Sequence, residues 1–253
     1  MRNNTSFRNQ SHENSVELSS RLWVDSAHRL PPVPALLETL LLLDLESQEL
    51  SIDLRGLSEL VLGDLGATVQ ILRLAGQEYG CAEGRPNRIE DCISDMGVHA
   101  CIEAVSTCNM TGKNCHDAIE EAWSHAREIA QFSRLIAEDV PEVNPDEAYL
   151  VGLLHSIGTL PVVLGWRQRE QDADDSVLTG SKMARQWMLP GFVQEFFSAL
   201  EADRRPTVWS EIVQMAHLRA KRSHQDCPFD HQIRPYLYRN IQSGFAAHAL
   251  AIG

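Results

Sequence analysis

The chain has 253 residues, of which 43% are hydrophobic and 23% are charged, and its formal net charge is −13. This composition is typical of a globular protein with its own core and excludes an intrinsically disordered chain. The acidic balance and the absence of a long basic run argue against nucleic acid as a direct partner, and no apolar run is long enough for a membrane span. Residues 1–10 also lack the apolar segment of a signal peptide, so we expect a cytoplasmic protein without a membrane partner.

The N-terminal part of the sequence predicts a mobile tail followed by a bundle of five helices. Residues 1–20 form the tail, because its largely polar start can bury little surface. The prolines of Leu30–Pro34 predict an extended segment before the next helix. The leucines from Leu36 to Leu43 predict a helix that is apolar around much of its circumference, and we expect it to be the deeply buried centre of the bundle. Further helices are predicted over residues 54–62, 65–75, 89–96 and 97–111, so the bundle spans residues 21–112.

The C-terminal part predicts a second helical subdomain over residues 113–253, with a hinge at Gly112–Asn114. Asn144 is a predicted N-cap, Pro145 occupies the first helical position, and Glu147 can complete a capping box. Helices are predicted over residues 117–138, 145–155, 176–187, 192–201, 209–222 and 234–250. No segment predicts a strand, so the fold class is all-α, in two subdomains.

Several residue groups resemble sites but are better explained as core or loop. The six cysteines contain no Cys-x-x-Cys pair and are predicted to be buried, reduced thiols. Cys101, Cys108 and Cys115 recur every seven residues, but seven residues of helix climb about 10.5 Å, too far to share one ion. The acidic run Asp172–Asp175 lacks the pattern of a calcium loop and is predicted to be solvated. Aromatic side chains at helical spacing favour core over a ligand pocket, and these are Trp123, Trp187, Phe192, Phe196 and Phe197.

Six segments together resemble the HDOD family, the HD-related output domains of bacterial signalling proteins. The resemblance covers roughly residues 28–225, with the segments in order. The segments are Leu30–Pro34, Leu72–Ala75, Arg88–Ile93, Trp123–Ala126, Gly152–Gly158 and Gly180–Pro190, the last resembling a Gly…Trp-x-Leu-Pro pattern.

The resemblance implies a relation to HD phosphohydrolases, in which histidines and aspartates hold ions that activate water. It places His125 at the first ligand position and His155 at the second, but Ser156 stands where the paired aspartate would be. Ser176 matches the next histidine, Ala199–Leu200 matches a His-His pair, and His217 falls near the last aspartate. Only three imidazoles remain, without the carboxylates, so the resemblance implies a dismantled hydrolytic site.

These residues leave two interpretations of the histidines: a vestigial metal or anion pocket, or structural histidines satisfied inside the core, which we favour. We therefore predict no catalytic residue, no bound metal and no cofactor. The predicted function is a non-catalytic bacterial signal-transduction module of HDOD type that binds signalling proteins or a small ligand. One alternative is a divergent metal-dependent phosphohydrolase that uses His125, His155 and His217. Another is a structural adaptor, a homodimer formed through the helix predicted over residues 234–250.

Overall fold

The computed structural model describes residues 33–47, 53–80, 84–106, 116–164, 166, 175–202 and 206–220. The chain divides into two compact units, Met1–Pro31 and Pro32–Gly253, and all of the described residues belong to the second unit. Within these residues the regular structure is helical throughout, which confirms the all-α fold class. The predicted tail at residues 1–20 and the helix at 234–250 lie outside the described residues.

The first group of helices precedes residue 107. Its members are α2 (Leu37–Ser47), α3 (Leu54–Leu62), α4 (Leu65–Tyr79), α5 (Ile89–Met96) and α6 (Val98–Ser106). The predicted helices over 54–62 and 89–96 have those same bounds, and the helix predicted over 65–75 continues four residues further. The group packs around α4, which contacts α3, α5 and α6, whereas α2 lies against α3 and α6.

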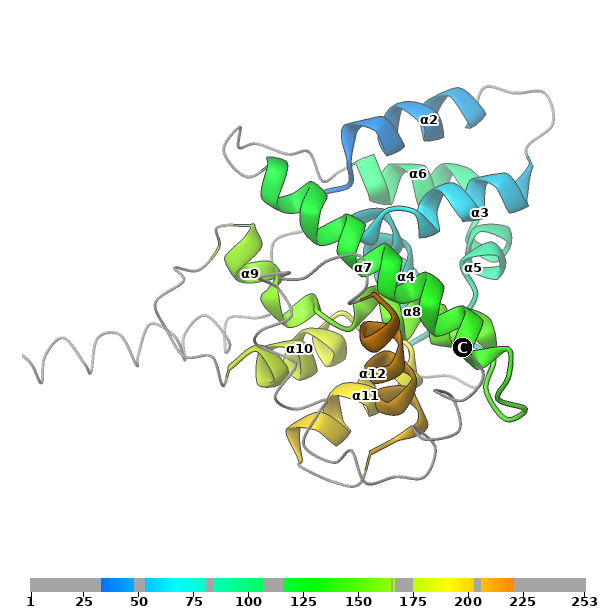
Figure 1. The fold of residues 1–253 in the computed structure, drawn as a ribbon. Helices are drawn as coiled ribbons and strands as arrows, with labels where there is room; N and C mark the ends of the chain where they lie inside the picture. Colours follow the sequence, from blue (N-terminus) through cyan, green and yellow to red (C-terminus); the bar gives the residue numbers. More distant parts are fainter. Residues whose placement is uncertain are drawn as a thin grey trace, which may run out of the picture. The chain divides into compact units, whose positions relative to one another are not determined.

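The second group is built on a long helix, α7 (His116–Ala137), and the helix that follows it, α8 (Pro145–Leu154). The remaining elements are the short η2 (Ile157–Thr159) and α9 (Leu160–Val163), followed by α10 (Asp175–Gln186), α11 (Gly191–Glu201) and α12 (Val208–Ala220). In Figure 1, α7 runs between the first group on one side and α10, α11 and α12 on the other. Both α11 and α12 pack on α8, and α12 also packs on α7.

Local capping explains where two of these helices begin. The side chain of Asn144 accepts a hydrogen bond from the backbone N–H of Asp146, and Pro145 is the first residue of α8, as predicted. Asp64 caps α4 in the same way, because its Oδ1 accepts from the N–H of Ala67 at 3.1 Å. A cap satisfies backbone donors that the helix itself leaves unpaired, so these residues fix the helix starts.

One fold prediction is wrong: α2 is not the buried centre of its group. Leu43 is 2% exposed, but Leu41 and Leu45 are 57% and 61% exposed, and Leu42 is also exposed. The physical reason is that, among the described helices, α2 packs mainly on α3 and α6, so one side of the helix is covered. The central position belongs instead to α4, whose residues from Leu65 to Leu72 are all buried.

Long-range hydrogen bonds join the first group of helices to the second. The buried carboxylate of Asp64 accepts from Trp123 Nε1 of α7 at 3.0 Å. Tyr149 of α8 donates to the carbonyl of Leu62 at 3.0 Å, and burial raises the pKa of this phenol, which keeps its donor proton. The predicted boundary between residues 112 and 113 lies outside the described residues and stays a prediction.

The segment after α10 makes a further connection to the first group. Met188 has a positive φ of 48°, and its carbonyl accepts a hydrogen bond from Arg85 Nη1. A Cβ added to Gly76 would lie 2.7 Å from Met188 Cβ, so α4 needs glycine at this approach. The Gly…Trp-x-Leu-Pro pattern therefore includes a backbone turn that docks against α4.

Candidate functional site

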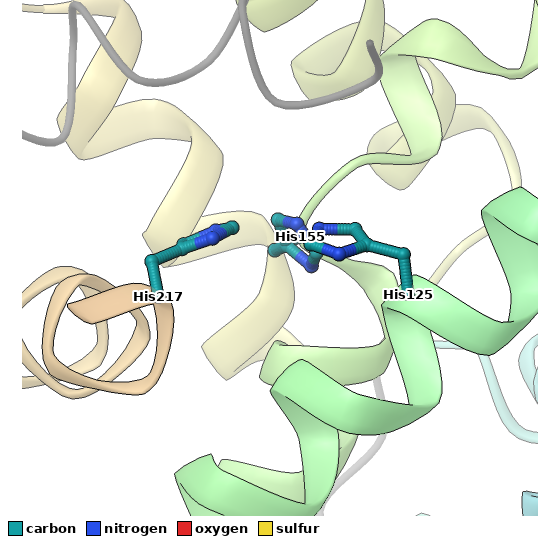
Figure 2. A group of neighbouring side chains, drawn as sticks. All are labelled: His125, His155 and His217. Atoms are coloured by element: carbon teal, nitrogen blue, oxygen red, sulfur yellow. The ribbon is translucent and has the colours of Figure 1, made fainter. Parts of the chain in front are cut away.

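Three of the predicted positions meet inside the second group of helices. His125 of α7, His155 at the end of α8 and His217 of α12 each offer one ring nitrogen, and these atoms lie within 4.8 Å of one another. The ring centroids are 5.6 Å apart for His125 with either partner and 4.8 Å apart for His155 and His217. Figure 2 shows the three rings directed toward one another. All three residues are buried, with exposures of 6%, 0% and 2% in chain order.

Close packing of α7 against α8 holds the first two histidines. A Cβ added to Gly152 would lie 2.8 Å from the Cα of Ala130 and 2.6 Å from Ser133 Oγ. Because glycine has no Cβ, the two backbones come together here, at Ala130, which follows His125 on α7, and at Gly152, which precedes His155. The third histidine, His217, lies on α12, which packs on both α7 and α8.

A hydrogen bond sets the orientation of the His155 ring. Its Nδ1 lies 2.6 Å from the carbonyl oxygen of Gly152. A carbonyl can only accept, so Nδ1 carries the proton, and in the neutral ring Nε2 keeps the lone pair. The same arrangement, a ring N–H donating to a backbone carbonyl, orients histidines that ligate metals.

The other predicted positions carry no metal-ligating side chain. Ser156 follows His155, and its carbonyl accepts from Thr159 Oγ1 at 2.7 Å, so its backbone closes the turn into η2. Ser176 is buried at the start of α10, where a Cβ added to Gly158 would overlap the Ser176 carbonyl oxygen. Leu200, matched to one of the lost histidines, is a core residue of α11.

The donor set limits the chemistry of the cluster. Among the described residues, no carboxylate and no thiolate belongs to the group formed by the three histidines. Three neutral imidazoles suit a borderline divalent transition ion such as zinc, but they do not supply carboxylates that could also hold and position ions. The residues present therefore fit a single ion held by nitrogen, and they do not fit a carboxylate-bridged hydrolytic centre.

The structure also contains a cleft that was not predicted from the sequence. It has a cavity volume of about 650 Å³ and lies where α3, α5, α7 and α8 meet. Asp146 forms ion pairs with Arg134 and, at 3.1 Å, with Arg88. The guanidinium of Arg134 also lies 4.9 Å from the ring centroid of Tyr149. The lining residues are Arg55, Ser58, Glu59, Leu62, Arg88, Ile89, Glu90, Arg134, Glu138, Pro145, Asp146 and Leu150.

The cleft is distinct from the histidine cluster, since none of the three histidines lines it. Sequence reasoning missed it because its wall comes from segments that are up to 95 residues apart along the chain, from Arg55 to Leu150. The acidic first turn of α8, at Asp146 and Glu147, was a local signal that one part of this wall is polar.

The described thiols, and all but one of the predicted aromatic core residues, are buried as expected. Cys92 and Cys101 are free and buried, and burial raises the pKa of Cys92 to about 12 and that of Cys101 to about 11. Such thiols stay protonated and behave as small apolar side chains. Trp123, Trp187, Phe196 and Phe197 are buried, whereas Phe192 is partly exposed and contacts the ring of Trp209. Cys108, Cys115 and Asp172–Asp174 lie outside the described residues.

Comparison with solved structures supports the architecture. The MmoQ response regulator from Methylococcus capsulatus is similar with a TM-score of 0.63 and 19% identity, over 87% of this chain and 98% of that one. A virulence factor from Campylobacter jejuni subsp. jejuni is similar with a TM-score of 0.52 and 14% identity, over 91% of this chain and 96% of that one. At these identities the likeness shows the fold alone, a bundle of helices.

The sequence itself defines the family. The HDOD domain profile matches residues 30–185, which is more than half of the chain. The chain therefore belongs to the HDOD domain family, as the six segments indicated. No curated protein matches the chain. Among the described residues, no helix is both long and apolar enough to cross a bilayer.

Proposed function

We propose that this chain is a non-catalytic regulatory module of HDOD type that acts by binding a signalling protein or a small ligand. The observation that carries the proposal is the makeup of the histidine cluster. His125, His155 and His217 meet at the positions where the resemblance places ion ligands, yet among the described residues no carboxylate joins them. The HD phosphohydrolases that the segments resemble use carboxylates to hold and position their ions, and three neutral imidazoles do not supply them.

Two further observations support a binding role. One structural neighbour is named a response regulator, which suits a role in signalling. The cleft beside Arg88 and Arg134 has the volume of a small-molecule site. Its guanidinium groups are already positioned by Asp146, so little side-chain entropy would be lost when a ligand binds.

The direct test is a turnover assay on the purified chain with phosphodiesters, phosphomonoesters and nucleotides. Each substrate is tested with added zinc, manganese or magnesium, and the same set is run on His125→Gln. We expect no turnover above buffer for either protein. Turnover at an enzyme-like rate that His125→Gln abolishes would overturn the proposal.

The second candidate is a divergent metal-dependent phosphohydrolase, and the convergence of the three imidazoles is the observation that favours it. The same assay separates the two functions, because this candidate requires both bound metal and turnover.

A homodimeric adaptor remains a prediction, since the helix at residues 234–250 lies outside the described residues. Deleting that helix and measuring the mass by light scattering tests it, and an unchanged mass would count against it. The cytoplasmic location and bacterial origin also stay predictions.

A further inference from the structure

The histidine cluster brings three nitrogens that can ligate a metal ion close together. Its three ring nitrogens lie within 4.8 Å of one another, whereas nitrogens around a tetrahedral zinc ion lie about 3.3 Å apart, given Zn–N distances near 2.05 Å. Binding of one ion by all three rings therefore requires rotations about χ1 and χ2 that bring the nitrogens closer together. The three side chains come from α7, the end of α8 and α12, so helix packing brings the ligands together.

The arrangement around His155 adds a second, independent observation. Its Nδ1 donates to the carbonyl of Gly152 at 2.6 Å, which leaves the lone pair on Nε2. That carbonyl belongs to the glycine at which α7 and α8 come together, so the ring is held against rigid backbone. A ring oriented in this way loses little freedom when it ligates a metal ion.

We propose that His125, His155 and His217 bind one divalent transition-metal ion, and that this ion ties α12 to α7 and α8. The all-imidazole donor set selects borderline ions such as zinc or cobalt over magnesium and calcium, which prefer oxygen ligands. Three protein ligands leave a fourth position for water or a ligand atom. The site goes beyond the proposed binding function, because the ion would stabilise the module without performing hydrolysis.

The proposal predicts that metal stabilises the fold. An ion that binds only the folded chain raises the melting temperature, and the rise grows with the logarithm of the free ion concentration divided by the dissociation constant. The ion should mainly stabilise the packing of α12 on α7 and α8. Of the three proposed ligands, α12 contributes only His217, so the ion connects α12 to the other two helices through that ring.

The test uses the full chain without an affinity tag, freed of metal by a chelator and then titrated with cobalt and with zinc. We expect one equivalent of cobalt to bind with the visible absorption of a low-coordinate nitrogen site, and zinc to displace it and raise the melting temperature. His217→Gln should weaken cobalt binding by at least tenfold and abolish the shift in melting temperature with zinc. His99→Gln is the matched control, because His99 is exposed on α6 and should bind metal like the wild type.

The outcomes separate this proposal from the proposed function. Absence of cobalt absorption and of a zinc-dependent melting shift in the wild type would overturn the metal site and leave the non-catalytic function standing. Equal cobalt affinity in His217→Gln and the wild type would overturn it as well. Turnover of a phosphate ester by the zinc-loaded chain would support the site but overturn the proposed function. If circular dichroism shows that metal-free His217→Gln is unfolded, His125→Gln takes its place with the same expected loss.

Discussion

Helices α2 and α8 are both strongly apolar but have different surroundings. Both are rich in leucine and carry apolar residues around most of their circumference. In α8 every residue from Ala148 to Leu154 is buried, because α7, α11 and α12 enclose it. In α2 the side chains of Leu41 and Leu45 are more than half exposed, because within the part of the chain that the structure describes this helix packs mainly on α3 and α6. An apolar circumference therefore permits burial, but the number of neighbouring helices decides whether burial occurs.

The two helices are also anchored differently at their N-termini. A local cap begins α8, where Asn144 accepts from the N–H of Asp146. At α2 the N–H of Leu36 donates instead to Oδ2 of Asp64 at 2.6 Å, a residue 28 positions away. The same carboxylate caps α4 and accepts from Trp123, so one buried side chain joins α2, α4 and α7. Helix α2 thus depends on a distant residue for the hydrogen bond at its start.

The largest effect should come from Asp64→Ala, which removes the anchor of α2. Three donors lose their acceptor in a buried site, and each such loss costs about 1–3 kcal/mol, so unfolding free energy should fall by about 3 kcal/mol or more. Urea unfolding measures the change. Asp53→Ala is the matched control, because Asp53 caps α3 through one exposed hydrogen bond and should cost about 1 kcal/mol. Equal losses for the two variants would contradict the role assigned to Asp64.

A second large effect is expected from Leu154→Ala at the end of α8. Leu154 is fully buried, and truncating such a leucine leaves a cavity that costs about 2–5 kcal/mol. The equivalent truncation in α2, Leu45→Ala, removes a side chain that is 61% exposed and should change stability by about 0.5 kcal/mol or less. Urea unfolding of the pair measures the contrast directly. A difference under about 1 kcal/mol would mean that the two helices are equally enclosed.

The sequence specifies most of the helices but not how they are enclosed. Caps and periodicity are local, so the start at Asn144 and Pro145 and the bounds of α3 and α5 could be predicted within a residue or two. The meeting of the three histidines was predicted only through the family resemblance, because no local pattern joins α7 to α12. The exposure of α2 and the hydrogen bonds of Asp64 depend on contacts between distant segments. Those contacts leave no periodic signal in a single sequence.

A smaller destabilisation is expected from Gly152→Ala, which tests the close approach of α7 to α8. The added Cβ would lie 2.8 Å from Ala130 Cα and 3.0 Å from the carbonyl oxygen of Ile129, both backbone atoms that cannot rotate away. Such overpacking costs about 1–3 kcal/mol, partly offset by the better helix propensity of alanine. Thermal and urea unfolding measure the net loss.

The control for this change is Gly56→Ala in α3. Its added Cβ would meet the side-chain carboxylate of Asp53, which can move, and the residue is exposed. Helix propensity then dominates, so Gly56→Ala should be neutral or stabilise by up to about 1 kcal/mol. Stabilisation by Gly152→Ala as well would show that α7 and α8 can separate without cost, against the packing described for α8.

The smallest effect is expected from the double variant Leu41→Gln and Leu45→Gln on the exposed side of α2. Glutamine forms helix nearly as well as leucine, and surface changes of this kind usually stay within about 0.5 kcal/mol per site. Leu43→Gln on the covered side is the matched control, since Leu43 is 2% exposed and its replacement buries an amide at a cost of about 2 kcal/mol or more. Urea unfolding of the three proteins measures the order. If the double variant lost as much stability as Leu43→Gln, α2 would be enclosed in solution as α8 is, and the leucines alone would have predicted its burial correctly.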